Sequence, residues 1–120
     1  MDKQLPRLGY RCRNPPLSHR DPNPMIFAEI RYNGDYDAHH ELLCKILEEH
    51  FGDVQHGLQC DSWIQVRKNG EQVNVDSFTS MKHEVKATSI ENKLVDEVIE
   101  VLKSSYTLNV HTPPTAEAHE

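Results

Sequence analysis

The segment SWIQVRKNGEQVNVDS, from Ser62 to Ser77, carries the strongest local signal in the chain. Two stretches with alternating apolar and polar residues are joined by Asn69-Gly70, a pair typical of a two-residue turn with positive φ. If Lys68 faces Glu71 across that turn, the aliphatic residues of both stretches fall on one side of the strand pair. These residues are Ile64, Val66, Val73 and Val75. The segment therefore predicts an antiparallel β-hairpin with one aliphatic and one polar face.

The polar face of this hairpin is expected to be open, because helices would cover the aliphatic side. It carries a tryptophan among hydrogen-bonding side chains, a mixture that resembles the composition of a protein interface. The predicted binding surface consists of Trp63, Gln65, Arg67, Gln72, Asn74 and Asp76. The alternative is that Trp63 packs at the sheet edge or under the N-terminal arm, as isolated apolar surface residues often do.

A strand and a helix are expected before the hairpin. Residues 25–32, MIFAEIRY, are short, β-branched and aromatic, and Asn33-Gly34 follows them with turn residues. Asp35 or Asp37 can cap the next helix, which Gly52 would end. Its apolar stripe has helical spacing and consists of Leu43, Ile46, Leu47 and His50.

Three elements are expected after the hairpin. The alternating segment MKHEVKA, residues 81–87, is either a third antiparallel strand or a bulged continuation of the second. Thr88 and Glu91 form a candidate capping box for a second helix, whose apolar face extends from Leu94 to Leu102. A final short strand, TLNVH, would end at Pro113.

The resulting order is β-α-β-β-(β)-α-β. It predicts an α+β fold, with an antiparallel sheet of four or five strands and two helices on one face. This order resembles the ferredoxin-like arrangement in topology alone. That arrangement hosts too many functions to indicate one.

Proline and charge are unevenly distributed along the 120 residues. Residues 1–24 hold five of the seven prolines and carry five basic and two acidic residues, a net charge of +3. The rest of the chain carries eight basic and seventeen acidic residues, a net charge of −9. We predict a basic irregular arm over residues 1–24, a single α+β domain over residues 25–112, and a disordered acidic tail over residues 113–120.

The cysteines and the hydropathy indicate the compartment. Cys12, Cys44 and Cys60 are an odd number without C-x-x-C spacing, so they predict no disulfide framework. No apolar window approaches the length of a membrane span, and no N-terminal apolar segment marks export. We expect a soluble protein of the reducing cytoplasm.

The segment HHELLCKILEEH, from His39 to His50, invites comparison with zinc proteases. His40, Glu41 and Cys44 read H-E-x-x-C, one residue away from the H-E-x-x-H motif. On a helix, His40 and Cys44 lie about 40° apart around the axis and about 6 Å along it, so both could bind one metal ion. His50 lies about 15 Å beyond His40 and cannot join them. We therefore predict no metal site and no cofactor, and expect solvent-side histidines with a small buried Cys44.

Other catalytic patterns are weaker. Asp76, Ser77, Ser80 and His83 have the residue types of a hydrolase triad, but no Gly-x-Ser-x-Gly turn accompanies them. His83, His111 and Cys60 could converge on a metal ion, although their spacing does not require it. No Gly-rich phosphate loop is present. An RNA-binding sheet would need several stacked aromatics in a basic surround, whereas only Trp63 is well placed.

The open sheet face and the lack of a catalytic constellation together favour a non-catalytic protein-interaction or self-association module. Its partner would be a second copy, forming a homodimer, or a basic protein that complements the acidic body. The same acidity disfavours nucleic acid and membrane surfaces. The alternative is a small-molecule-binding sensor or enzyme that uses a cleft between the first helix and the sheet. Its first candidate residues are His40, Cys44, His83 and Asp76.

Overall fold

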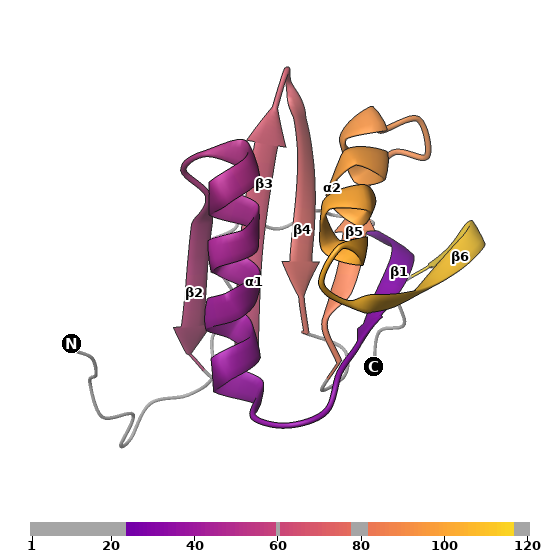
Figure 1. Ribbon diagram of the computed structural model, residues 1–120. Coiled ribbons are helices and arrows are strands. Elements are labelled where there is room, and N and C mark those ends of the chain that lie inside the picture. Colours follow the sequence, from indigo (N-terminus) through magenta and orange to yellow (C-terminus); the bar gives the residue numbers. More distant parts are fainter. Residues whose placement is uncertain (1–23, 60, 78–81, 117–120) are drawn as a thin grey trace.

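The computed structural model describes residues 24–59, 61–77 and 82–116. These residues form an open, six-stranded antiparallel sheet with two helices on one face (Figure 1). The elements are β1 (Met25–Arg31), α1 (Tyr36–Phe51), β2 (Gln55–Gln59), β3 (Asp61–Lys68), β4 (Glu71–Asp76), β5 (Glu84–Ala87), α2 (Lys93–Lys103) and β6 (Thr107–Ala116). The predicted α+β class is confirmed.

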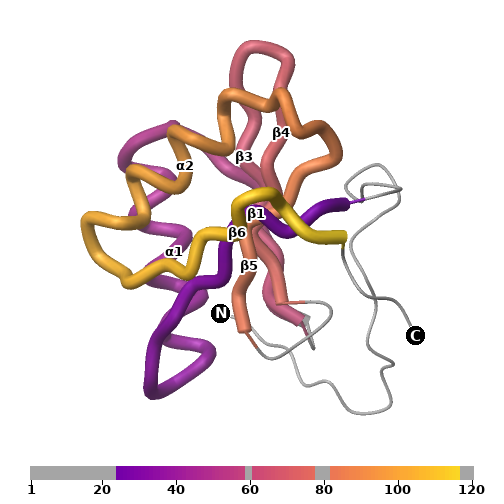
Figure 2. Tube along the Cα trace, turned by 90° about the vertical axis from the view of Figure 1, so that its right-hand side faces the viewer, coloured from indigo at the N-terminus to yellow at the C-terminus, as the bar shows by residue number. Residues whose placement is uncertain are grey.

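The two helices share one face of the sheet, whose strand order is β2-β3-β4-β5-β1-β6. Helix α1 packs on β2 and β3, α2 packs on β4, β5 and β6, and the helices contact each other. A view at right angles to the first shows both helices on the same side of the strands (Figure 2). Neither helix in the described ranges is long and apolar enough to cross a membrane.

The predicted hairpin is confirmed in its turn and its register. Asn69 and Gly70 have φ angles of 53° and 82°, the positive values that this two-residue turn requires. Lys68 faces Glu71, and the aliphatic pairs match as expected, Val66 with Val73 and Ile64 with Val75. All four aliphatic side chains are fully buried beneath the helices. The hairpin thus supplies the centre of the hydrophobic core.

The sheet has one strand more than the predicted maximum of five, because β2 has no local pattern. Strand β2 was not predicted, since QHGLQ has a single large apolar residue, and its pairing with β3 holds it in the sheet. Strand β5 is a separate strand that pairs with both β4 and β1. The resemblance to the ferredoxin-like arrangement therefore does not extend to the strand number or the exact order.

The last strand also extends further than predicted. Strand β6 continues through Pro113 to Ala116, and Ile26 and Met25 of β1 pair with Thr115 and Ala116. Proline is tolerated there because β6 is an edge strand, with β1 as its one partner in the described sheet. The predicted boundary between domain and tail therefore falls inside a strand.

Helix α2 begins at a different cap from the one predicted. Its N-cap is Asn92, whose side chain accepts a hydrogen bond from the Val95 N–H, and not Thr88. The two N–H groups between Asn92 and Val95, those of Lys93 and Leu94, donate hydrogen bonds to the carboxylate of Glu71 in β4. A partner distant in sequence thus helps to fix the start of the helix, and the local Thr-x-x-Glu pattern does not.

Candidate functional site

The predicted binding surface lies together on the sheet face away from the helices, but much of it is buried. Cross-strand pairing joins Trp63 to Asp76, Gln65 to Asn74, and Arg67 to Gln72. Yet Gln65, Asn74 and Asp76 are buried, Trp63 and Gln72 are half-buried, and Arg67 is exposed. The expectation of an open polar face is therefore wrong for three of the six residues.

Two interactions help to explain this burial. The buried Lys86 Nζ lies 2.6 Å from Asp76 Oδ1 and 3.6 Å from Glu84 Oε1, so opposite charges compensate one another on this face. The indole of Trp63 lies across Gly57 of β2, where an added Cβ would stand 2.6 Å from Trp63 Nε1. Trp63 thus packs against an edge strand, the alternative that the sequence left open.

The residues suggested by the hydrolase and multi-strand metal patterns do not converge. Asp76 bonds Lys86 on one face of the sheet, whereas His83 lies under the helices with its ring hydrogen-bonded to Tyr32. His111 lies on β6 beside Glu29 and Thr115. Ser80 and Cys60 lie outside the described residues. Neither pattern forms a site from its described members.

A cavity of about 450 Å³ lies near the end of β1. Its lining is largely polar and charged and lacks the candidate residues of the first helix. The lining residues are Glu29, Ile30, Arg31, Tyr32, Asn33, Lys82 and Thr107. This cavity is therefore distinct from the predicted cleft between the helix and the sheet.

The helix-covered face changes from apolar to polar beneath the first turns of α1. Along this face, Ser62 precedes Ile64 in β3, Ser77 follows Val75 of β4, and His83 precedes Val85 of β5. The three polar side chains are at most 2% exposed. The alternation of the strands thus places two hydroxyls and an imidazole where the aliphatic core would otherwise continue.

Hydrogen bonds join this polar patch to α1. Ser62 Oγ lies 2.5 Å from His40 Nδ1 and 2.7 Å from His83 Nε2, while the Tyr32 hydroxyl lies 2.7 Å from His83 Nδ1. The Tyr36 hydroxyl bonds the Ser77 hydroxyl and accepts the Ser62 N–H at 2.9 Å. Burial lowers the pKa of both His40 and His83 to about 4, so both rings are neutral at pH 7.

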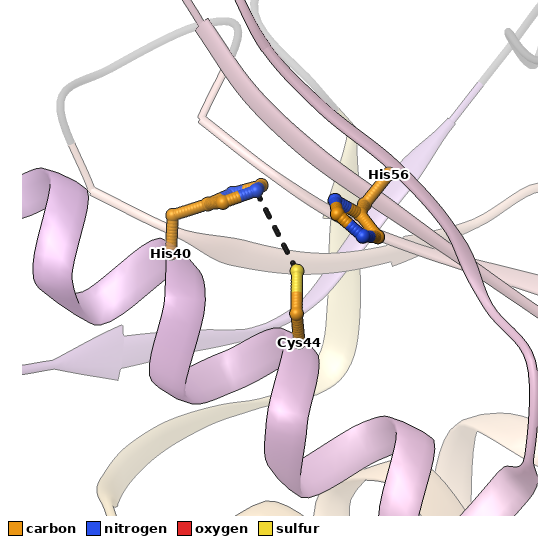
Figure 3. A group of neighbouring side chains, drawn as sticks. All are labelled: His40, Cys44 and His56. Carbon is orange, nitrogen blue, oxygen red and sulfur yellow. Dashed lines mark hydrogen bonds between the residues drawn. The ribbon is translucent and has the colours of Figure 1, made fainter. Parts of the chain in front are cut away.

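The other nitrogen of His40 faces Cys44 and, across the gap to β2, His56 (Figure 3). His40 Nε2 and Cys44 Sγ are 3.5 Å apart, and one donor atom from each of the three residues lies within 4.8 Å of the others. A tetrahedral zinc ion with ordinary bond lengths separates a nitrogen and a sulfur ligand by about 3.6 Å. The helix pair already has that spacing, and His56 needs a small inward shift.

The electrostatics of this cluster disfavour a nucleophile. Burial, followed by the charges of Glu48 and Glu41, raises the pKa of the Cys44 thiol to about 12. A thiol with so high a pKa is protonated at pH 7, which disfavours a catalytic dyad of His40 and Cys44. Glu48 Oε2 also lies 4.0 Å from His56 Nε2. The same carboxylates would attract a metal ion.

Sequence reasoning found two members of the cluster and missed the third. The prediction that Cys44 is buried is confirmed, whereas His40 is 4% exposed and does not lie on the solvent side. His50 lies away from the cluster and bonds Glu97. The prediction of no metal site considered His50 as the third residue, whereas the residue that lies beside His40 and Cys44 is His56, from the unpredicted strand β2. No motif in the sequence marks that residue.

Comparisons of the chain with protein-family models, curated protein sequences and solved structures found no match in any of the three.

Proposed function

We propose that this protein binds a zinc-class transition-metal ion through His40, Cys44 and His56. The observation that carries the proposal is the convergence of three donor atoms, from α1 and β2, within 4.8 Å of one another. Two imidazoles and one thiolate suit Zn²⁺ and its neighbours in the first transition row, whereas Mg²⁺ and Ca²⁺ prefer oxygen ligands.

The groups around the three donors support the same reading. Metal-bound histidines commonly donate their second ring N–H to an oxygen acceptor, which fixes the ring orientation. His40 has Ser62 Oγ at 2.5 Å in that place. His56 has the Glu48 carboxylate, 4.0 Å from Nε2, which would favour binding through Nδ1. His40 thus has a hydrogen-bond partner for the nitrogen that the metal does not need, and His56 has a carboxylate near that nitrogen.

The geometry favours metal sensing or storage over hydrolysis. A metal ion here would tie α1 to the edge strand β2, so binding would stabilise a contact between two elements. A thiolate ligand donates charge to the ion and makes its bound water a poorer acid and nucleophile. The proposal develops the alternative of a sensor in the cleft between the first helix and the sheet. A reducing cytoplasm, the predicted location, would keep Cys44 available as a ligand.

Cobalt titration of the metal-free protein tests the proposal, because Co²⁺ reports thiolate ligation by its absorption. In a background with Cys12 and Cys60 replaced by serine, we expect one ion per chain and a sulfur-to-cobalt band. A Zn²⁺ concentration about 100 times Kd should add about 2.7 kcal/mol of stability. His56→Ala and Cys44→Ser should each weaken binding strongly.

His50→Ala is the matched control, since His50 is on the same helix but bonds Glu97. It should bind metal like the parent protein. If His56→Ala bound as tightly as His50→Ala, the three-residue site would be wrong. A parent protein that bound no Co²⁺ or Zn²⁺ would contradict the function itself.

Protein interaction is the second candidate, on a narrower surface than the sequence predicted. Trp63 is half-buried and Arg67 is exposed, beside the edge strand β2, and the charge of the chain outside the N-terminal arm favours a basic partner. Sedimentation equilibrium of the native protein and of Trp63→Ala tests the homodimer. Monomers in both samples at high micromolar concentration would exclude it, and a pull-down without a basic protein would count against a foreign partner.

A further inference from the structure

The hydroxyl of Ser62 lies between two imidazole rings. Its Oγ is 2.5 Å from His40 Nδ1 and 2.7 Å from His83 Nε2. A hydroxyl has one proton and two lone pairs, so Ser62 can donate to only one of the two rings, and it then accepts from the other. In the neutral form each ring carries one proton. The proton positions of the two histidines are therefore coupled through Ser62.

Hydrogen bonds connect Cys44, His40, Ser62, His83 and Tyr32 in that order, and we call this series the hydrogen-bond chain. The contact between His40 and Cys44 selects the direction in which its protons are donated. A thiol can donate its proton to an imidazole nitrogen, whereas its sulfur is a weak acceptor. With Cys44 donating to His40 Nε2, the His40 proton lies on Nδ1 and is donated to Ser62 Oγ. Ser62 then donates to His83 Nε2, and His83 Nδ1 donates to the Tyr32 oxygen, 2.7 Å away. All four contacts are satisfied in this order.

The reverse direction is less favourable. It would place the His40 proton on Nε2, facing sulfur at 3.5 Å, and would leave the thiol proton without a role in the chain. It would also block the nitrogen that faces Cys44 and His56. The order that suits the thiol is thus the order that leaves a lone pair directed at the metal position.

We infer that Ser62, supported by His83 and Tyr32, is a positioning residue of the metal site, which holds His40 in the tautomer whose Nε2 can bind the ion. This inference rests on the proposed metal site. It also explains why polar residues interrupt an apolar sheet face. Outer partners of this kind typically change metal affinity 10–100-fold when removed.

Further contacts hold this series of hydrogen bonds in place at Ser62, its middle, and at Tyr32, one of its ends. Ser62 and His83 have no exposed surface, so bulk water does not reach their side chains to replace a lost partner. The Ser62 backbone donates to the Tyr36 hydroxyl at 2.9 Å and accepts from the Ser77 N–H at 3.1 Å. At the Tyr32 end, the Tyr32 ring stacks on His39 with a centroid distance of 4.0 Å. Such fixed partners suit a group that sets the orientation of a ligand.

The first experiment reads the tautomer directly in the metal-free protein. Long-range ¹H–¹⁵N NMR on histidine-labelled protein should show His40 protonated at Nδ1 and unprotonated at Nε2. Ser62→Ala should move His40 toward the tautomer protonated at Nε2, whereas Ser62→Thr, which restores a hydroxyl, should return it. A merely structural role for Ser62 would leave the tautomer unchanged in all three proteins.

The second experiment measures Co²⁺ and Zn²⁺ affinity in the same proteins. Ser62→Ala should bind 10–100-fold more weakly, with Ser62→Thr close to the parent protein. Tyr32→Phe removes the hydroxyl that accepts the last hydrogen bond of the hydrogen-bond chain, and it should also weaken metal binding. Its matched control is Tyr106→Phe, because the Tyr106 hydroxyl bonds His39 Nδ1 at 2.8 Å, outside the chain. That variant should keep the parent affinity.

The outcomes separate the inference from the proposed function. A parent protein that binds no metal overturns the function, while the NMR result still decides whether the chain sets the tautomer. A parent protein that binds metal, with Ser62→Ala equal in affinity and in tautomer, overturns the inference. If Ser62→Ala does not fold, equal affinities of Tyr32→Phe and Tyr106→Phe would overturn it instead.

Discussion

Helix α2 packs on an aliphatic part of the sheet, whereas the first turns of α1 lie over serine, histidine and tyrosine side chains. The strand residues facing α2 include Val75 of β4 and Val85 of β5, both fully buried. Continuing along the same two strands on the same face, the next residues are Ser77 and His83, which are buried as deeply. One sheet face thus has an apolar region beneath α2 and a polar region beneath the first turns of α1.

The aliphatic region stabilises the fold, whereas the polar region provides the side chains that could take part in binding. Burial of aliphatic side chains contributes directly to stability. Burial of hydroxyls and imidazoles costs free energy unless each finds a partner, so a satisfied polar cluster at best offsets its own cost. A polar patch within an apolar face therefore calls for a function. Here its hydrogen bonds end at His40, a proposed metal ligand.

The largest expected effect is in the aliphatic region. Leu102 of α2 is fully buried in the core, and Leu102→Ala should lower the free energy of unfolding by about 2–5 kcal/mol. Urea unfolding followed by circular dichroism measures the loss. Metal affinity should be unchanged at temperatures where the variant is folded, because no proposed ligand lies on α2.

Leu42→Ala is the control for this substitution. Leu42 lies on α1 with 43% of its surface exposed, so its removal should change stability by no more than about 0.5 kcal/mol. If Leu102→Ala lowered metal affinity in folded protein, the two regions would not be independent.

The sequence predicted the aliphatic region well because its signals are local. Asn69-Gly70 fixes the hairpin register, and the helical spacing from Leu94 to Leu102 defines the buried face of α2. Strand β2 was missed, because its place in the sheet comes from pairing with β3 and not from a pattern of its own. Partners distant in sequence decide such elements.

The polar region was predicted only in part for the same reason. Helix geometry alone brings His40 and Cys44 to one side of α1, and strand alternation places His83 on the same face as Val85. The third donor, His56, depended on β2. The burial of His40 depended on Ser62, 22 residues away, which supplies its hydrogen bond. A polar side chain is buried where it finds hydrogen-bond partners, and those partners can be distant in sequence and carry no local pattern.

Low pH should reduce the stability of the protein through protonation of the polar region. Burial lowers the pKa of the fully buried His83 to about 4, whereas an unfolded histidine titrates near 6.5. The unfolded chain therefore binds a proton first, and stability falls as the pH drops from about 6.5 toward 4. At pH 5, His83 alone should cost about 2 kcal/mol in the metal-free protein. Urea unfolding at pH 7, 6 and 5 with a chelator measures this.

Two variants assign the acid sensitivity. His83→Gln should show a flatter dependence on pH, whatever its stability at pH 7, because the titrating group is gone. Leu42→Ala removes an exposed side chain without a titrating group and should keep the slope of the parent protein. Equal slopes in His83→Gln and the parent would place the acid sensitivity elsewhere.

The smallest expected effect compares the starts of the two helices. Asn92 before α2 and Asp35 before α1 have nearly the same backbone, with φ and ψ of −71° and 112° against −72° and 120°. Asn92 accepts the Val95 N–H at 3.3 Å and donates to the Gln72 carbonyl at 2.9 Å, while Asp35 makes no capping bond with its side chain. The two positions differ in side-chain contacts and not in conformation.

Asn92→Ala should therefore cost about 1 kcal/mol, the usual effect of losing an N-cap. Asp35→Ala should cost only about 0.3 kcal/mol, because it removes a favourable charge near the helix dipole without breaking a hydrogen bond. Urea unfolding of both variants at pH 7 measures the difference. Equal losses would mean that Asp35 caps α1 in solution, and the start of α1 would then be held by its own cap. The larger loss at Asn92 would leave the His40 and Tyr36 contacts with the sheet as the groups that hold the first turns of α1 in place.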